Sequence, residues 1–312
     1  MLARLSRPDD GFNFGPPVTS TGDPSGEFNP IIILFINHLE KTNNLHALDQ
    51  AIESAYQKAP KFMDTFDIIG VDSFLRFADD LLGWIPREGS EGQDVYNTLC
   101  MFYFAFNQSP LEELQNPTTP DASGRPLTWL SSWLVVYSQL VGLWMDTTES
   151  LTEESLESFK RSKHYDVDEA LPPPGGWKAF NEFFSRQLKA DARPIESPLD
   201  DKVIVYPAYC KYDSSVADHV VSISSAGTVL IKNLPWTIGS LLRGSEYAND
   251  FNGAVWMHGF LNAYNYHRQH APVSGEVIEA KIIQGSNYFE VDVDGNKLQA
   301  PVTPGFRQLC AP

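Results

Sequence analysis

The run Leu-Pro-Pro-Pro-Gly-Gly at residues 171–176 is the strongest constraint on the fold of this chain. Proline lacks the backbone N–H that helices and sheets use, and glycine is costly to order, so regular elements stop at such a run. Before it apolar residues recur at helical spacing, and after it they form short strand-like segments. We therefore expect two domains joined by a linker at residues 171–176.

Residues 29–170 predict an all-helical domain. Asn29 followed by Pro30 has the pattern of an N-cap with proline at the first helical position. Apolar residues spaced three and four apart then form successive stripes, as in helices packed on a common core. These stripes run through residues 31–44, 48–56, 71–82, 95–106 and 129–145. Ser150 with Glu153 resembles a capping box for a last helix.

Residues 177–312 predict a second domain that is rich in strands. One short helix, from Trp177 to Leu188, precedes them. The candidate strands are residues 203–206, 220–223, 228–231, 254–257, 276–283 and 288–293. Asp294-Gly295 follows an alternating segment and signals a hairpin, so we expect mainly antiparallel pairing. The predicted fold class is α+β, preceded by a flexible arm at residues 1–28.

The charge of the chain is uneven. Its 312 residues carry a net charge of −17, and residues 1–170 account for −15 of it. Such an acidic surface argues against nucleic acid as a partner and is repelled by an anionic membrane leaflet. Hydrophobic residues make up 42% of the chain, which is sufficient for a folded core.

The cysteines and apolar segments predict a soluble cytoplasmic protein. Cys100, Cys210 and Cys310 lie far apart and form no CxxC pair, which favours a reducing compartment without disulfides. The N-terminus lacks the apolar segment of a secretory signal. Residues 129–145 are short for a membrane span, and their polar residues, Ser131 among them, form one stripe of a core helix. We expect no transmembrane segment.

Two histidines stand out as candidate catalytic residues. His267 and His270 are three positions apart, after an aromatic stretch and before a Pro-Val-Ser-Gly turn. Residues at i and i+3 share one face of a helical turn, and histidine exchanges protons near neutral pH. The alternative is a surface helix end whose histidines bind the last carbonyls.

Four segments after the linker resemble motifs of the phosphatidylserine decarboxylase family, in the family's order. They are residues 180–195, similar to FFxRxLKxxARPI; residues 205–209, at the place of SPAD; residues 231–242, similar to KGxxYSLxxLL; and residues 266–272, similar to YHRxHxP. Joined to a helical domain, they also resemble a fungal branch of the family. That branch includes the L-tryptophan decarboxylase of psilocybin biosynthesis, a soluble enzyme.

The resemblance implies a pyruvoyl-dependent decarboxylase. Its substrate would be the serine head group of phosphatidylserine or a free aromatic L-amino acid, and the acidic, anchor-free chain favours the amino acid. Decarboxylation needs an electron sink, which the family makes as a covalent pyruvoyl group by self-cleavage at a serine. The family's roles imply that His270 activates this serine and that His267 donates a proton in the decarboxylation. Arg268 and Tyr266 are candidate substrate contacts, and a structural ion pair is the alternative for Arg268.

The chain departs from the family pattern at the residue that orients the processing histidine. The family has the aspartate of SPAD there, whereas this chain has Tyr209, followed by Cys210. A tyrosine hydroxyl can bond an imidazole but supplies no negative charge. Asp213, in a shifted register, is the alternative.

The self-cleaving serine is the second departure. The family's LGST or GGSS motif is absent, and Ser240, Ser245 and Ser286 follow glycines at the wrong places. We therefore expect an incomplete β-rich domain whose pyruvoyl-forming serine is not in this chain. A truncated chain, whose partner is the C-terminal α chain of the processed enzyme, and a degenerate paralogue both remain open.

Two other functions compete with the decarboxylase. A catalytically inactive paralogue or fragment with a binding or regulatory role would explain Tyr209 and the missing serine. A metal enzyme using His258, His267 and His270 is a third hypothesis, but no HExxH arrangement accompanies them, so we expect no metal. An incomplete sheet exposes unpaired backbone groups, so we expect the chain alone to aggregate and residues 29–170 to fold independently.

Overall fold

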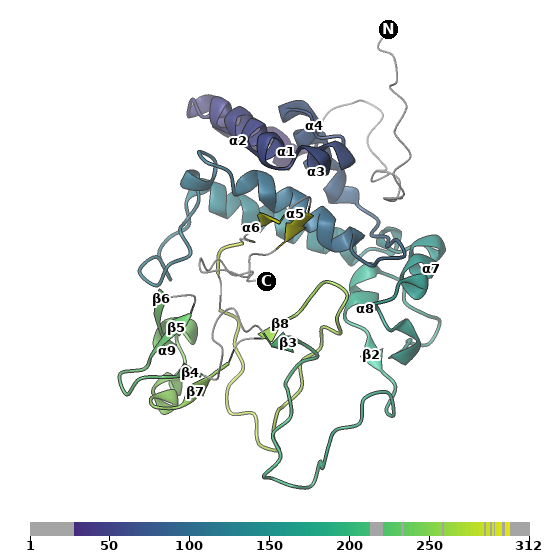
Figure 1. Cartoon of the computed structure of the whole chain (residues 1–312), viewed down its shortest axis with the longest axis vertical. Helices are drawn as coiled ribbons and strands as arrows, with labels where there is room; N and C mark the ends of the chain where they lie inside the picture. The colour runs from purple at the N-terminus through teal and green to yellow at the C-terminus, as the bar shows by residue number, and fades with distance from the viewer. Residues whose placement is uncertain are drawn as a thin grey trace.

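The structure is a computed structural model that describes residues 28–212, 221–231, 234–257, 259–283, 285–287, 289, 291–294 and 297–299. It is α+β, as the sequence predicts: helices dominate the first part and short antiparallel strands the second (Figure 1). The predicted arm at residues 1–28 lies outside the described residues except for Phe28.

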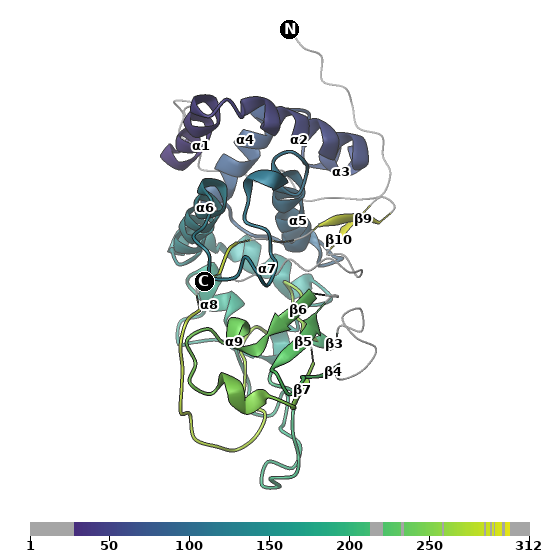
Figure 2. The same cartoon turned by 90° about the vertical axis from the view of Figure 1, so that its left-hand side faces the viewer.

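The helices of the first part form two layers, with α1–α4 stacked on α5 and α6 (Figures 1 and 2). They are α1 (Pro30–Lys41), α2 (Leu45–Lys58), α3 (Pro60–Thr65), α4 (Val71–Asp80), α5 (Asp94–Phe106), α6 (Trp129–Met145) and α7 (Glu153–Arg161). Five of these helices follow the predicted apolar stripes, and α3 was not predicted. Pro60 ends the stripe of α2 but serves α3 as its first residue, which proline tolerates.

Stacked aromatic side chains fill the space between the helices, both between the layers and within the α5–α6 layer. Phe35 of α1 lies 4.5 Å from Trp133 of α6, and Phe102 of α5 lies 4.8 Å from Tyr137, as measured between ring centroids. The Tyr137 hydroxyl donates to the carbonyl of Ala78 at 2.6 Å, so its buried polar atom is satisfied. The apolar stripes of different helices thus meet in one core.

Two predicted helix caps differ from the hydrogen bonds in the structure. Asn29 is the N-cap residue of α1, but its side chain donates to Asp79 Oδ1 at 3.0 Å and does not cap the helix. The capping box of α7 is Thr152 with Ser155, and not Ser150 with Glu153. The reason is that Ser150 is fully buried and its hydroxyl binds the carbonyl of Met145 at 3.0 Å.

The predicted polar stripe of α6 was wrong at Ser131. This serine is buried, and its Oγ accepts a hydrogen bond from the backbone N–H of Asn116 at 2.8 Å. On the same helix Leu143 is 64% exposed. A buried hydroxyl with a partner costs little, so hydrophobic periodicity alone misassigned the faces.

The second part consists of two-stranded antiparallel pairs. They are β1 (Ala170–Leu171) with β2 (Gln187–Leu188), β3 (Lys211–Tyr212) with β8 (Gly259–Phe260), β4 (Val221–Ser222) with β7 (Val255–Trp256), β5 (Thr228–Ile231) with β6 (Leu234–Thr237), and β9 (Asp292–Asp294) with β10 (Lys297–Gln299). The predicted hairpin after Asp294 is confirmed, since Asp294 pairs with Lys297. The segments 203–206 and 276–283 were predicted as strands but lack a ladder, and Ile204 and Ile282 are 76% and 89% exposed.

The predicted helix from Trp177 to Leu188 is much shorter. Only α8 (Phe180–Phe184) is helical, because Gln187 and Leu188 leave the helix to pair with Leu171 and Ala170. Tertiary strand pairing here overrides the helical preference of the sequence.

A small lobe, residues 221–231 and 234–257, has its own core. It contains β4–β7 and the short helix α9 (Ile238–Leu241), packed around Val229, Ile231 and Trp236. We call it the β5–β6 lobe.

The main core continues across the predicted linker. Phe180, Phe183 and Phe289 belong to the same buried cluster as the aromatic residues of α5 and α6. The Tyr103 hydroxyl also donates to Asn287 Oδ1 at 2.8 Å, which ties the second part to α5. The predicted domain boundaries and the independent folding of residues 29–170 remain predictions. Among the described residues, no helix is both long enough and apolar enough to cross a bilayer.

The shared core makes Phe183 a test of cooperative folding. Phe183→Ala removes a fully buried ring, and we expect the free energy of unfolding to fall by about 3–5 kcal/mol. Urea unfolding followed by far-UV circular dichroism measures it, and helices and strands should melt together. Leu199→Ala, at a side chain that is 97% exposed, is the control and should change stability by no more than about 0.5 kcal/mol. A loss of the same small size for Phe183→Ala would contradict the shared core.

Candidate active site

Three of the four motif-like segments meet around residues 266–270. Arg268 Nε donates to the carbonyl of Ser185, in the first segment, at 2.7 Å. The backbone N–H of His270 donates to the carbonyl of Pro207, in the second segment, at 2.7 Å. Residues separated by some 60 to 80 positions in the sequence are thereby fixed beside the two histidines.

The histidines do not lie on a helix. Residues 266–270 are irregular backbone that follows a turn, in which the N–H of Asn265 donates to the carbonyl of Asn262 at 2.9 Å. The predicted helical turn was wrong because the His270 N–H bonds across to Pro207 instead of within its own segment. The two imidazoles therefore lie in different surroundings.

His267 is largely enclosed by protein. Its ring stacks on Phe184 with the centroids 4.0 Å apart, and Nε2 lies 3.1 Å from the carbonyl oxygen of Asn262. A carbonyl only accepts hydrogen bonds, so in the neutral ring we assign the proton to Nε2. Burial lowers the pKa of His267; hydrogen bonds to backbone carbonyls oppose this effect, and the charge of Arg186 adds to it. The resting imidazole is therefore uncharged at neutral pH.

His270 is exposed, and the hydroxyl of Tyr266 holds its ring. Tyr266 Oη lies 3.0 Å from His270 Nε2, and the two rings stack with their centroids 5.6 Å apart. Tyr266 is itself buried, and its hydroxyl lies within hydrogen-bond distance of the histidine. The predicted role of Tyr266 as a substrate contact remains a prediction.

Tyr209 and Arg268, also marked by the sequence, have other contacts. The Arg193 guanidinium carbon lies 3.8 Å from the centroid of the Tyr209 ring, a cation–π contact. The hydroxyl that bonds His270 is therefore that of Tyr266, and Asp213 lies outside the described residues. Arg268 is exposed, and within the described part of the chain no carboxylate forms an ion pair with it.

Arg186 is a buried cation beside His267 that the sequence reasoning missed. Its Nη2 donates to the carbonyls of Tyr165 at 2.8 Å and Tyr264 at 3.3 Å, and its side chain lies over the Phe183 ring. Nε and Nη1 are buried without a hydrogen-bond partner among the described residues. Burial lowers the pKa of Arg186, but a guanidinium stays charged. The sequence signal that could have identified Arg186 is the arginine of the FFxR motif.

A second buried group links this region to the helices. The Tyr165 hydroxyl donates to Glu88 Oε1 at 2.6 Å, and the backbone N–H of Asp94 donates to Glu88 Oε2 at 2.8 Å. Burial raises the pKa of Glu88 to about 7, against the opposing effect of these hydrogen bonds. Glu88, Tyr165 and Arg186 thus form one buried polar network next to His267.

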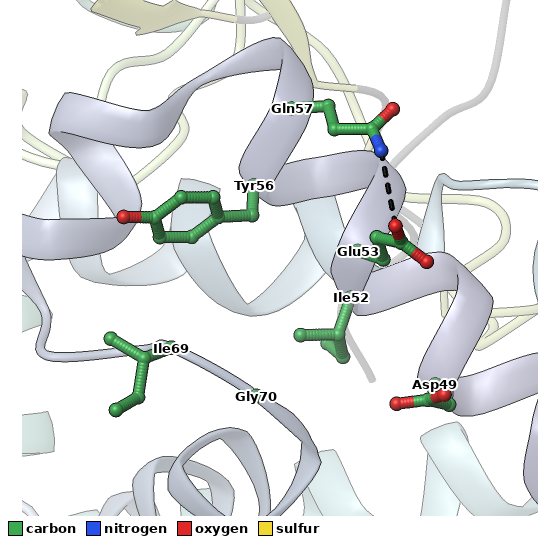
Figure 3. A pocket seen from close by; sticks show the side chains of 7 residues that line it. All are labelled: Asp49, Ile52, Glu53, Tyr56, Gln57, Ile69 and Gly70. Atoms are coloured by element: carbon green, nitrogen blue, oxygen red, sulfur yellow. Dashed lines mark hydrogen bonds between the residues drawn. The ribbon is translucent and has the colours of Figure 1, made fainter.

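One hollow in the helical region does not belong to this site. A cavity of about 370 Å³ on α2 is lined by Asp49, Glu53 and Tyr56, and Gln57 donates to Glu53 at 3.2 Å (Figure 3). It lies in the helical layer farthest from the β-rich part (Figure 1). Among the described residues no three potential metal ligands cluster, and His258 lies outside them.

Comparison with known proteins agrees with the motif resemblance. Residues 180–303 match the sequence model of the phosphatidylserine decarboxylase family. Phosphatidylserine decarboxylase proenzyme 3 of Schizosaccharomyces pombe is 34% identical over 147 residues, and the proenzyme of Myxococcus xanthus is 31% identical over 134 residues. These alignments cover 47% and 43% of this chain, and 14% and 45% of the relatives. The resemblance predicted from the four segments is confirmed.

A fungal decarboxylase is similar over a longer stretch. Decarboxylase iboD of Amanita muscaria is 27% identical over 195 residues, which cover 55% of this chain and 52% of iboD. Residues 180–312 make up less than 55% of the chain, so the aligned part must also include residues of the helical region. The chain thus spans about half or less of the length of these three relatives.

Glu88→Gln tests the buried network through the pH dependence of stability. The folded pKa of Glu88, about 7, lies above its ordinary value of 4.5, so the folded protein holds this proton more tightly than the unfolded chain. This contribution of Glu88 to the free energy of unfolding is fully present below pH 4.5 and is lost as the pH rises through 7. Glutamine does not titrate, so between about pH 5 and pH 8 we expect the wild type to lose roughly 2–3 kcal/mol relative to the variant. Urea unfolding at both pH values measures the difference, and a constant difference would contradict a buried, titrating Glu88.

Proposed function

We propose that this chain, whose residues 180–303 match the sequence model of the phosphatidylserine decarboxylase family, carries the proton-transfer residues of a pyruvoyl-dependent carboxy-lyase. The observation that carries this proposal is the meeting of three family-like segments at two histidines, through the Arg268–Ser185 and His270–Pro207 hydrogen bonds. One imidazole is half-buried and the other exposed. Contrasting environments suit two different proton-transfer roles.

The residues present fit a pyruvoyl group. The oxygens of such a group accept hydrogen bonds, and the buried Nε and Nη1 of Arg186 are donors in need of acceptors. When present, the group supplies a carbonyl that condenses with the substrate amine and takes up the electrons released by decarboxylation. We propose that His267, His270 and Arg186 lie around it.

His267 is the proposed proton donor to the carbon that loses CO2. Burial and, to a smaller extent, the charge of Arg186 favour the neutral ring, so an extra proton that the ring takes from solvent is readily passed on to the substrate carbon. Stacking on Phe184 and the hydrogen bond to Asn262 fix the orientation of the imidazole. An acid group that is held in one orientation does not have to reorient before it transfers the proton.

His270 is the proposed base for the self-cleavage that forms the pyruvoyl group. Its side chain is exposed, so a serine on another chain segment can approach it. Tyr266 orients its ring. We infer that the serine comes from outside this sequence, on a C-terminal α chain. The relatives named proenzymes, and the partial coverage of their length, support this inference.

The proposed substrate is a free amino acid with an aromatic side chain. The charge of −15 on residues 1–170 supports a dissolved substrate, because an anionic membrane surface repels this part of the chain. Phosphatidylserine is the second candidate, supported by the names of the other relatives. An inactive paralogue with a binding role is the alternative to both, and the first experiment below separates it from them.

Intact mass of the protein from its native source, under denaturing conditions, tests pyruvoyl formation. We expect two chains that together exceed 34.9 kDa, the smaller one blocked at its N-terminus. A single species of 34.9 kDa would support the inactive paralogue. Release of CO2 from carboxyl-labelled L-tryptophan and from phosphatidylserine then identifies the substrate.

His267→Ala tests the proton donor. We expect turnover to fall by roughly 10²–10⁴-fold with processing intact, because only the decarboxylation uses this proton. Mass spectrometry and CO2 release measure the two steps separately. His46→Ala, at an exposed position on α2, is the control and should leave both unchanged. Loss of processing in His267→Ala, with normal turnover of any processed enzyme, would reverse the assignment.

Tyr266→Phe tests how His270 is positioned. Removing the hydroxyl frees the His270 ring but keeps the buried aromatic volume, so we expect processing to slow by about tenfold, the effect of one lost hydrogen bond. The rate of chain cleavage after synthesis measures it. Equal slowing by Tyr247→Phe, an exposed tyrosine of the β5–β6 lobe, would indicate a general effect.

A further inference from the structure

A cavity of about 1030 Å³ lies between the β5–β6 lobe and residues 116–127, the loop before α6. In Figure 1 this loop descends from the helical layer to β6. The loop lies outside residues 180–303, the part that matches the family. The helical region therefore supplies one wall of a cavity whose other walls come from the family-like part.

The two main walls differ in chemistry. The lobe contributes an apolar wall that includes Ile231, Trp236, Ile238 and Trp256, whereas the loop contributes Asn116, Thr118, Thr119 and Ser123. Arg125 of the loop and Arg243 of the lobe also line the cavity, and no carboxylate is among its described lining residues. A ligand with an apolar body and a hydrogen-bonding polar atom matches these walls, and an ammonium group finds two cations and no carboxylate there.

Two buried polar atoms in the cavity walls have no hydrogen-bond partner among the residues that the structure describes. They are Oγ1 of Thr118, on the loop, and Nε1 of Trp256, on β7 of the lobe. Buried polar side-chain atoms in folded proteins are nearly always hydrogen-bonded, so an unpaired hydroxyl and an unpaired indole N–H in one cavity indicate a missing ligand or solvent. The indole N–H needs an acceptor, and the hydroxyl can donate or accept.

The loop is seated tightly against the lobe. Gly124 has φ of +78°, and a Cβ built on it would come within 2.5 Å of Arg243 Nη1. Glycine adopts this backbone conformation freely and allows the close approach of the arginine. At Gly124 the loop therefore lies directly against Arg243 of the lobe.

The cavity reaches the proposed catalytic segment through Gln269. This residue lies between Arg268 and His270, and it lines the cavity together with Gly259. Neither histidine lines the cavity, so in the proposed arrangement the amine and carboxylate lie at the histidines and the side chain extends past Gln269 towards the lobe.

We infer that this cavity binds the side chain of the substrate, an aromatic ring that carries a polar atom, and that the 116–127 loop selects it through Thr118. The inference rests on the proposed decarboxylase function and adds to it a site and a selecting loop. A ring hydroxyl can accept from Trp256 Nε1 and donate to Thr118, and a ring N–H can donate to Thr118. A lipid acyl chain would leave both atoms unpaired, which disfavours phosphatidylserine as the occupant.

Calorimetric binding of product-type amines tests the inference without turnover. The probes for the full protein are tyramine, tryptamine, phenethylamine and ethanolamine. We expect tyramine and tryptamine to bind about three- to tenfold more tightly than phenethylamine, which lacks the polar atom, and ethanolamine to bind least. Thr118→Val and Trp256→Phe should each weaken tyramine binding by about three- to tenfold, and only Thr118→Val should weaken tryptamine. Thr65→Val and Trp177→Phe, away from the cavity, should change nothing.

Each outcome has one meaning for the inference. Equal affinity for phenethylamine and tyramine, or unchanged tyramine binding in both cavity variants, would overturn it. Tight binding of a short-chain phosphatidylserine that Thr118→Val does not affect would also overturn it. If His267→Ala still loses turnover in that case, the proposed function stands without this pocket. If the amines bind as expected but the protein is unprocessed, the pocket stands and the decarboxylase function fails.

Discussion

The buried guanidinium of Arg186 is the constraint on which the arrangement of the site depends. A buried cation destabilises a fold unless hydrogen bonds and aromatic faces compensate it. Here the carbonyls of Tyr165 and Tyr264 accept from it, and Phe183 lies against it. These partners come from the end of the helical region, from α8 and from the turn before the histidines. Satisfying one charge therefore holds three distant segments together.

Burial, with a smaller effect from the same charge, distinguishes the two histidines. His267 is partly enclosed by protein and lies near the charge of Arg186, and both favour its neutral form. His270 faces solvent, and its ring lies within hydrogen-bond distance of the Tyr266 hydroxyl. Since the polar network reaches Glu88 through Tyr165, the ionisation of a carboxylate in the helical region lies two contacts from the site. This network gives the helices a role in the site beyond packing.

Much of the local structure could be predicted from the sequence. The residue ranges of α6 and β5, and the hairpin after Asp294, follow from periodicity and turn residues, which depend on near neighbours in the chain. The failures occurred where a distant partner intervened. Ser150 is bonded to Met145 and Phe180 instead of capping α7, and Leu188 pairs with Ala170 instead of extending α8.

The sequence by itself determined the helical first part, the antiparallel character of the second and the family-like segments with His267 and His270. Only the tertiary structure decided that Tyr266 and not Tyr209 bonds His270, that Arg186 is buried beside His267, and that Thr118 and Trp256 line one cavity. The physical reason is that propensity and periodicity act over a few residues, while burial and hydrogen bonds between remote segments exist only after the chain has packed.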